Sequence, residues 1–231
     1  LLTNNAGDPV ALQPSYVTVA QDGSWSYTPT TELTDGSYTW VAQVMDAAGN
    51  TSSSSAITLN IDTVAPTLSD VGLEASSDSG QLDDDSITND TTPTFSGTAE
   101  KGNQIELKLF NTNTSSSETA AYTFTTTVTN NDGSWSLDTP PLAQGSYNWV
   151  VVATDAAGNT SEKSSSTPLV IDTEITGFEA GLDASTDSGD SSSDDITNVT
   201  QVKVSGKGEV GATVTLTSLV NTASGAPVTV P

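Results

Sequence analysis

The stretch LAQGSYNWVVVATDAAGNTS, residues 142–161, decides the fold of this chain. Tyr147, Trp149, Val151 and Ala153 fall on one parity of it, as expected for a strand that buries one of its two faces. The DAAGN segment that follows is typical of a tight turn, in which the Asp side chain bonds its own backbone and Gly or Asn takes a positive φ. The stretch therefore predicts a long core strand followed by a turn.

The same pattern occurs about 109 residues earlier, which reveals an internal repeat. GSYTW at 36–40 corresponds to GSYNW at 145–149, and DAAGNTS occurs at both 46–52 and 155–161. The remaining repeated pairs keep the same order: DGSW at 22–25 and 132–135, IDT at 61–63 and 171–173, ASSDSG at 75–80 and ASTDSG at 184–189, SITN at 86–89 and DITN at 195–198, and FSGTAEKG at 95–102 and VSGKGEVG at 204–211.

The repeat divides the chain into three predicted domains. Residues 1–66 are the C-terminal part of a first repeat, residues 67–175 are a complete repeat, and residues 176–231 are the N-terminal part of a third. Half a sandwich would expose unpaired strand edges and half a core. We therefore expect the parent protein to continue in both directions.

Within the repeat, short segments of alternating polarity are separated by Gly, Asn, Asp and Pro, and no amphipathic helix competes with them. For example, Ile105, Leu107 and Leu109 point one way, whereas Glu106 and Lys108 point the other. About seven such strands in roughly 110 residues predict an all-β fold of tandem immunoglobulin-like β-sandwich domains in an elongated rod.

One residue of the core strand has two interpretations. Tyr38 and Tyr147 stand at the start of the penultimate predicted strand of their repeats. This is the position of a tyrosine corner, in which the phenol hydroxyl bonds the backbone upstream. The alternative is an ordinary core aromatic.

Composition excludes several classes of function. The chain has 29 acidic and 5 basic residues, a net charge of −24, and neither Cys nor His. Such a chain repels nucleic acid and anionic membranes, and it lacks the residues of disulfides, Cys/His zinc sites and histidine-based catalysis. We expect no enzyme. A hydrolase using Asp84 and Asp85 is a weak alternative, because two carboxylates in a loop lack a pocket that separates their pKa values.

The acidic residues gather in two equivalent stretches that contain no Lys or Arg. Asp78, Asp83, Asp84, Asp85 and Asp90 lie in the first, and the second holds Asp187, Asp190, Asp194 and Asp195. Crowded carboxylates repel one another, and Ca²⁺ with its shell of oxygen ligands relieves that repulsion. The alternative is a pair of solvated acidic loops.

Topology adds a second argument for calcium at the domain junctions. In an immunoglobulin-like sandwich, the loop after the first strand lies where the last strand leaves, so the acidic stretch should lie near Asp172. The turns with Glu100 or Glu209, and the DAAGN turns, belong at the opposite end, facing the preceding domain. The predicted calcium ligands are Asp62, Asp78, Asp84, Asp85, Asp90, Glu100, Asp155, Asp172, Asp187, Asp194, Asp195 and Glu209. No EF-hand or nonapeptide calcium motif occurs.

The repeat as a whole resembles a known family. TNDTTPTFSGTAEKGN (88–103), NDGSWS (131–136), L-x-x-GSY (142–147), ATDAAGNTS (153–161) and the IDT linker are similar to the bacterial Ig-like extender repeats of giant adhesins exported by type I secretion. The resemblance covers the whole chain. The second linker departs from the pattern, because it lacks the proline found at Pro66 in the first.

The resemblance implies an extender module that holds a ligand-binding tip away from the cell and binds calcium at its junctions. It implies an extracellular location, on the bacterial surface or secreted. The implied partners are adjacent repeats of the same chain and, through another region, a host-cell or biofilm surface, with no nucleic acid and no membrane insertion. We expect calcium to bridge neighbouring domains and stiffen the rod.

A rival function is that the module itself binds a glycan or a host receptor. Trp25, Trp40, Trp135 and Trp149 would then supply stacking surfaces. Their recurrence at equivalent strand positions favours core packing instead.

Overall fold

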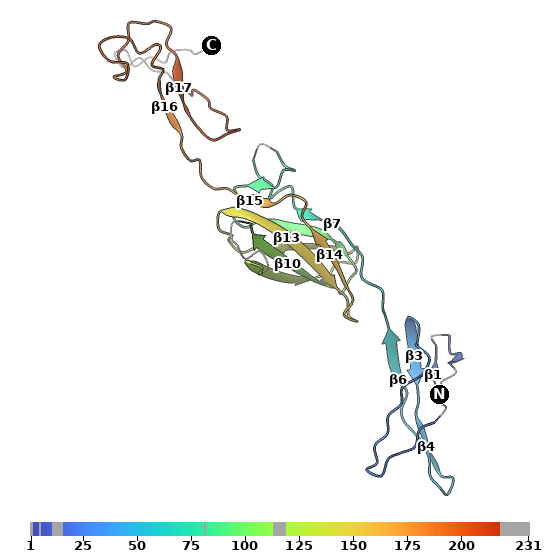
Figure 1. Cartoon of the computed structure of the whole chain (residues 1–231). Helices are drawn as coiled ribbons and strands as arrows, with labels where there is room; N and C mark the ends of the chain where they lie inside the picture. The colour runs from blue at the N-terminus through green and yellow to red at the C-terminus, as the bar shows by residue number, and fades with distance from the viewer. Residues whose placement is uncertain (1, 5, 11–15, 81, 113–118, 218–231) are drawn as a thin grey trace. The chain divides into compact units, whose positions relative to one another are not determined.

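The computed structural model of the chain describes residues 2–4, 6–10, 16–80, 82–112 and 119–217 (Figure 1). The chain divides into two compact units, residues 1–172 and 173–231. Every regular element in the described residues is a β-strand, so the predicted all-β class is confirmed. The end of the third predicted repeat, residues 218–231, lies outside the described residues.

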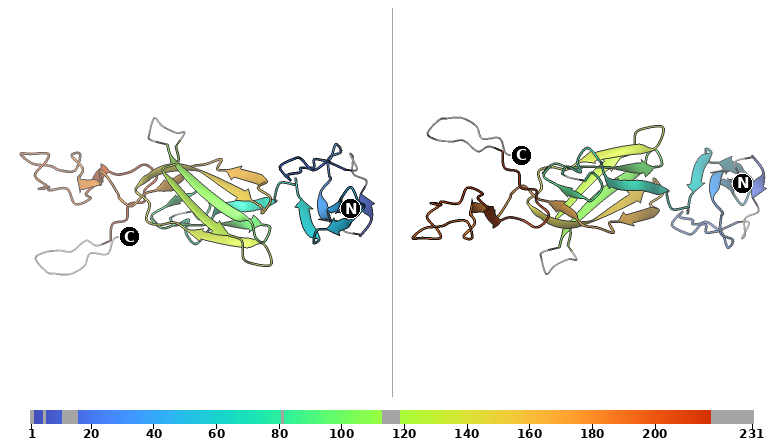
Figure 2. Two further views of the ribbon diagram at one scale, coloured as in Figure 1. Left: turned by 90° about the horizontal axis from the view of Figure 1, so that it is seen from below. Right: turned by 90° about the horizontal axis from the view of Figure 1, so that it is seen from above.

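Residues 67–172 form a sandwich of two sheets, which Figure 2 shows from two further directions. One sheet has the strand order β12–β9–β7, and the other has the order β11–β10–β13–β15–β8, with β14 also paired to β13. The strands are β7 (Leu68–Leu73), β8 (Ile87–Thr88), β9 (Thr94–Ala99), β10 (Gln104–Asn111), β11 (Tyr122–Thr127), β12 (Ser134–Asp138), β13 (Gly145–Thr154), β14 (Thr160–Ser164) and β15 (Leu169–Ile171).

These nine segments correspond to the roughly seven strands that the sequence predicts. The first strand is divided between the sheets, because β7 pairs with β9 whereas β8 runs parallel to β15. The last strand is divided into β14 and β15, which pair with successive parts of β13. Ser165 interrupts it there, since its N–H bonds the Trp149 carbonyl and its Oγ accepts the Trp149 N–H.

The core lies between the two sheets, where the alternating strand faces meet. Ile105, Leu107 and Leu109 of β10 are fully buried, as predicted, and so are Tyr147 and Val151 of β13. On β10 the intervening residues Glu106 and Lys108 lie on the opposite face, where they form an ion pair. The alternation therefore sets which side of the sheet packs against the other sheet.

Two Trp contacts join strands within this core. The rings of Phe95 and Trp149 meet edge to face at 5.8 Å between centroids, a favoured aromatic geometry. The Trp135 indole covers Gly97, where an added Cβ would lie 2.7 Å from the indole Cζ2. Glycine at position 97 therefore makes room for the indole.

The DGSW motif is explained by the turn that precedes β12. Asp132 Oδ1 accepts hydrogen bonds from the Ser134 N–H at 3.0 Å and the Ser134 hydroxyl at 2.7 Å. Gly133 has φ of 79°, and a Cβ there would lie 2.4 Å from the Ala99 carbonyl oxygen. Only glycine fits this position, so the turn fixes where Trp135 enters the core.

Tyr147 forms a tyrosine corner, as one of the two interpretations of its position predicts. Its hydroxyl donates to the Ala143 carbonyl at 2.9 Å, and the Tyr38 hydroxyl donates to the Thr34 carbonyl at 2.8 Å. Both tyrosine rings are buried. Each corner ties the start of a core strand to the segment before it.

The residues on either side of the sandwich form smaller groups of strands. In residues 1–66, β2–β1–β3–β6 form one sheet and β4–β5 form a hairpin, and in residues 173–231, β16 pairs with β17. Their bounds are β1 (Leu2–Thr3), β2 (Pro9–Val10), β3 (Gly36–Trp40), β4 (Gln43–Met45), β5 (Thr51–Ser53), β6 (Ile57–Ile61), β16 (Glu179–Leu182) and β17 (Val204–Lys207). Among the described residues, no helix has the length and apolar character needed to cross a membrane.

Candidate functional site

The first acidic stretch, residues 74–90, contains one buried carboxylate. The Asp78 side chain belongs to a residue only 6% exposed, and its Oδ2 accepts the Ser86 N–H at 3.0 Å. Its Oδ1 is also buried, but no described residue donates a hydrogen bond to it. A buried carboxylate oxygen without a donor or a cation costs considerable free energy. Asp78 therefore presents an oxygen that is suited to a cation.

The second acidic stretch, residues 183–199, repeats this arrangement. Asp187 is 5% exposed, its Oδ2 accepts the Asp195 N–H at 3.3 Å, and its Oδ1 again lacks a donor among the described residues. Ser86 and Asp195 are the two donors, and both have a positive φ, 62° and 59°, which is uncommon for residues other than glycine. The same unusual geometry thus occurs in both copies.

A threonine hydroxyl ties the two sides of each loop together. Thr88 is buried, and its hydroxyl donates to the Ser77 carbonyl at 2.6 Å. Thr197 donates to the Thr186 carbonyl in the same way. Sequence reasoning predicted the aspartates but missed this support, although the recurrence of ITN at 87–89 and 196–198 was a signal for it.

Other predicted ligands in these stretches bond the backbone of their own turns. Asp85 Oδ1 accepts the Ile87 N–H at 3.0 Å, Asp90 Oδ1 accepts the Thr92 N–H at 2.8 Å, and Asp194 Oδ1 accepts the Ile196 N–H at 3.2 Å. Asp84 is exposed. Within the described residues, no three acidic side chains gather closely enough to form a metal centre. Asp78 and Asp187 are therefore the strongest candidates, and the ligand role of the others stays a prediction.

Asp172 lies beside the first acidic stretch at the end of the last strand. Its N–H donates to the Thr88 carbonyl at 2.9 Å, and two residues earlier the Val170 N–H donates to the Ser86 carbonyl at 2.9 Å. These bonds continue the parallel pairing of β15 with β8. The acidic stretch is thus bonded to the segment through which the chain leaves the sandwich.

Glu100 lies at the opposite end, where the chain enters the sandwich. Its Oε1 accepts the Thr67 N–H at 3.3 Å and the Thr67 hydroxyl at 3.4 Å. Glu209 bonds Thr176 in the same way, at 2.8 and 2.7 Å. The N–H of Thr176 is the main group that holds the pKa of Glu209 below its usual value. Both glutamates therefore anchor the start of a repeat, and their role as calcium ligands stays a prediction.

Asp155 bonds its own turn, as the alternative interpretation of DAAGN predicts. Its Oδ1 accepts the N–H groups of Ala157 at 2.8 Å and Asn159 at 2.9 Å. The Asn159 amide donates to Asp155 Oδ2 at 2.8 Å, and this bond is the main cause of the lowered pKa of Asp155. The same amide donates to the Asp62 carbonyl at 3.1 Å. Asp62 itself is exposed, and its Oδ1 accepts the Val64 N–H at 3.1 Å.

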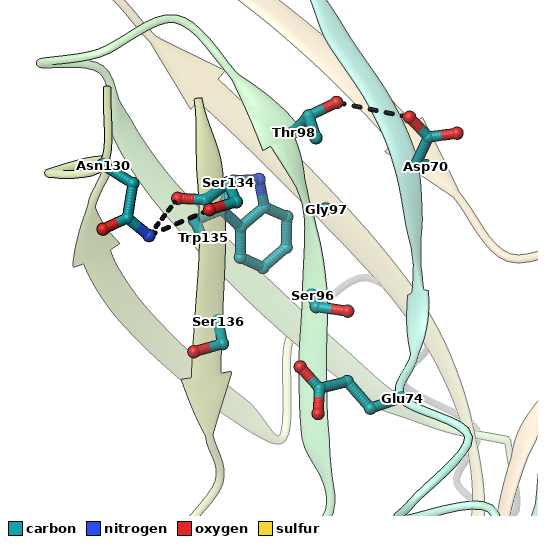
Figure 3. Close-up of a pocket in the computed structure, with 9 residues that line it drawn as sticks. All are labelled: Asp70, Glu74, Ser96, Gly97, Thr98, Asn130, Ser134, Trp135 and Ser136. Atoms are coloured by element: carbon teal, nitrogen blue, oxygen red, sulfur yellow. Dashed lines mark hydrogen bonds between the residues drawn. The ribbon is translucent and has the colours of Figure 1, made fainter. Parts of the chain in front are cut away.

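A cavity of about 420 Å³ lies over β7, β9 and β12, and Figure 3 shows its lining. A register irregularity in β7 accompanies Asp70, whose φ is 53° and whose Oδ2 accepts the Thr98 hydroxyl at 3.3 Å. The Trp135 indole at this cavity packs into the core and is almost fully buried. Trp149 is buried too. Neither indole therefore offers the stacking surface that glycan recognition would require.

Comparison with known proteins gives two kinds of likeness. The family model described as "Bacterial Ig-like domain" matches residues 2–63 and 65–173. A solved structure described as "Crystal structure of tetra-tandem repeat in extending region of large adhesion protein" has 28% sequence identity and a TM-score of 0.37, covering 79% of this chain and 43% of that chain.

A second solved structure is described as "Ca2+-stabilized adhesin helps an Antarctic bacterium reach out and bind ice". It has 27% identity and a TM-score of 0.31, with coverage of 64% of this chain and 34% of that one. The chain thus spans less than half the length of either solved chain. No curated protein matches it.

Proposed function

Because the chain belongs to the bacterial Ig-like domain family, we propose that it is a structural extender module of a bacterial cell-surface adhesin, stiffened by calcium at its acidic loops. In this role the chain carries no catalytic activity. Its task is mechanical: the sandwiches keep a binding tip at a distance from the cell. The module acts outside the cell, on the surface or in a secreted protein.

The observation that carries the calcium proposal is the buried carboxylate oxygen of Asp78, repeated in Asp187. Two independent copies of one loop retain an acid whose Oδ1 has no donor among the described residues. A loop that only needed to be solvated would have no reason to bury a carboxylate, because burial without a partner costs free energy. A bound Ca²⁺ would supply the positive charge that this oxygen lacks.

Hydrogen bonds connect the Asp78 loop to the end of β15, where the following linker starts. Ser86 bonds the Asp78 carboxylate through its N–H and the Val170 N–H through its carbonyl. Thr88 bonds the Asp172 N–H through its carbonyl. Asp78, β8 and the end of β15 are therefore one connected unit. Fixing the Asp78 carboxylate fixes the segment from which the following linker starts.

The affinity required for this function is modest. Extracellular calcium modules have dissociation constants of about 10⁻⁴ to 10⁻³ M. Loops of that class fill at roughly millimolar calcium and stay empty at cytosolic levels. The net charge of −24 then favours a flexible chain before export and an ordered one outside the cell.

Thermal unfolding and small-angle X-ray scattering of the 231-residue chain, with calcium and with a calcium chelator, test the proposal. We expect calcium to raise the melting temperature and to increase the maximum dimension. Magnesium at equal ionic strength is the control, because it prefers a tighter octahedral shell. If chelator changes neither the melting temperature nor the dimension, calcium does not stiffen this chain.

A further inference from the structure

The DAAGNTS motif at 155–161 has side-chain donors that its own turn does not use. Asp155 Oδ2 accepts one N–H of the Asn159 side-chain amide at 2.8 Å, and such an amide has two N–H groups to donate. Asn159 also donates to the main-chain carbonyl of Asp62 at 3.1 Å, 97 residues earlier. The Ser161 hydroxyl donates to the main-chain carbonyl of Pro66. The motif therefore binds a segment that precedes the sandwich.

That segment is the first linker, residues 62–66, which lies between β6 and β7 (Figure 1). Asn159 bonds its first residue, and Ser161 bonds its last. Glu100 then holds the next residue, Thr67, through its N–H and its hydroxyl. Pro66 is buried, whereas residues 62–65 range from half-buried to exposed at the surface. The first linker is thus bonded at both ends to the sandwich that follows it.

The Asn159 amide is held in place by its own turn. Asp155 Oδ1 accepts the Asn159 N–H at 2.9 Å, while its Oδ2 accepts the side-chain amide. In the first copy of the motif, Asp46 holds Asn50 in the same way, at 2.8 and 2.7 Å. An amide that is already oriented loses less rotational freedom when it binds. Asp155 therefore positions Asn159 toward the linker.

The bonds from Asn159 and Ser161 go to main-chain carbonyls, which every residue carries. They do not depend on which side chains the linker has. The second linker differs in sequence and lacks a proline, yet the residue after it is held as Thr67 is, because Glu209 accepts the N–H and the hydroxyl of Thr176. A site of this kind accepts linkers of different sequence.

The preceding repeat also contacts the first linker, but at an exposed position. The N–H and the hydroxyl of Thr63 donate to Asp35 Oδ1 at 3.1 and 2.9 Å, and both bonds are exposed. The bond from Ser161 to Pro66 is partly buried. Water competes less for a buried hydrogen bond, which is also stronger in its less polar surroundings. The following sandwich is therefore the firmer support for the linker.

We propose that the DAAGNTS motif is a docking site for the main chain of the linker that precedes its sandwich. Asn159 and Ser161 bind the linker carbonyls, and Asp155 positions Asn159. The linker then moves as one body with the sandwich that follows it, and no metal ion is needed. This role is separate from calcium at the acidic loops, since every contact in it is a hydrogen bond between protein groups.

Backbone ¹⁵N relaxation of the Val64 and Ala65 amides in the full chain tests the proposal, with a calcium chelator present throughout. The wild type should give order parameters of about 0.85, as a rigid backbone does, and Asn159→Ala/Ser161→Ala should lower them below about 0.6. Asn50→Ala/Ser52→Ala is the matched control, because it makes the same two changes in the first copy of the motif. It should leave the linker amides as rigid as in the wild type.

Single variants separate docking from damage to the turn. Ser161→Ala removes only the hydroxyl that binds Pro66 and should lower the order parameter of Ala65, whereas Ser161→Thr keeps a hydroxyl and should retain it. Asp35→Ala, which frees Thr63 from the preceding repeat, should leave Ala65 rigid.

Three results would overturn the proposal: a wild-type linker that is flexible in chelator, a linker that stays rigid in Asn159→Ala/Ser161→Ala, or one that Asp35→Ala alone releases. Because calcium is absent from every sample, these results are independent of whether calcium stiffens the chain.

Discussion

The backbone N–H of Ser86 donates a 3.0 Å hydrogen bond to Oδ2 of Asp78, while Oδ1 of the same carboxylate is buried without a donor from the described residues. The pair holds the aspartate in one orientation. Since Asp195 holds Asp187 in the same way, the loop is built around an oxygen that faces inward. This geometry leads to the first prediction.

Asp78→Asn should abolish most of the stabilisation that calcium gives to the sandwich. At a calcium concentration one hundred times the dissociation constant, a site adds about 2.7 kcal/mol of stability, and the amide removes the charge that the site depends on. In chelator the variant should be at least as stable as the wild type, because the buried charge is gone. Thermal unfolding in calcium and in chelator measures both effects.

The control for that substitution is Asp83→Asn, which makes the same change at an exposed position of the same loop. The rise in its melting temperature on adding calcium should be nearly the same as that of the wild type. An equal loss in both variants would mean that the total charge of the loop matters and that the buried Asp78 does not.

Tyr147→Phe should destabilise the sandwich by about 1 kcal/mol, the usual contribution of one hydrogen bond. The substitution removes the hydroxyl that donates to the Ala143 carbonyl and leaves the aromatic ring in the core. For a domain of about 100 residues, this lowers the melting temperature by roughly 4–8 °C. Tyr16→Phe, at an exposed tyrosine, is the control. Unchanged melting of Tyr147→Phe would show that the corner adds no stability.

The Asp155 turn should lose its stabilising effect only in acid. The Asn159 side-chain amide is the main group that lowers the pKa of Asp155 in the folded chain. The unfolded value is about 3.9. A carboxyl with a depressed folded pKa stabilises the fold above its unfolded pKa, and the effect is lost as pH falls through the lower folded value.

Thermal unfolding from pH 5 to pH 2 checks this sign. The wild type should keep the contribution of Asp155 at pH 5 and lose it below about pH 3.9. Asn159→Ser removes the amide donor, so the pKa of Asp155 should rise toward its ordinary value and the melting curves should show a shallower acid dependence. A steeper dependence in Asn159→Ser would contradict the assigned cause.

Glu100→Ala should loosen the start of the sandwich without changing calcium binding at Asp78. The Glu100 carboxylate holds both the N–H and the hydroxyl of Thr67. Its loss should speed hydrogen exchange of the Thr67 amide by about threefold to tenfold, the effect of one hydrogen bond. Glu106→Ala, on the outer face of β10, should leave that amide protected. If chelator alone released the Thr67 amide in the wild type, the contact would depend on calcium.

Much of the fold could be predicted because its signals are local. The alternation of Ile105, Leu107 and Leu109 with polar residues determines which side of β10 is buried, whatever the rest of the chain does. The GSYNW and DAAGN motifs likewise combine a strand with the turn chemistry that ends it. The division of the first strand into β7 and β8 could not be predicted, because it depends on parallel pairing with β15, about 80 residues later.

The candidate site was harder to predict, because burial in the folded chain decides which of its acidic residues are candidate ligands. The sequence shows five aspartates in the first stretch, but it does not distinguish Asp78, which is buried, from Asp84, which is exposed. Asp85 and Asp90 could have been assigned to turns, because each caps the residue two positions later. The Glu100–Thr67 contact joins residues 33 positions apart, so no local sequence pattern predicts it.

Isothermal calorimetry of calcium binding to the full chain, compared with the Asp78→Asn/Asp187→Asn double variant, tests the central claim most directly. The account predicts about two loop sites per wild-type chain, with dissociation constants of about 10⁻⁴ to 10⁻³ M, and their loss in the double variant. No binding heat from the wild type, or an unchanged isotherm from the double variant, would contradict it.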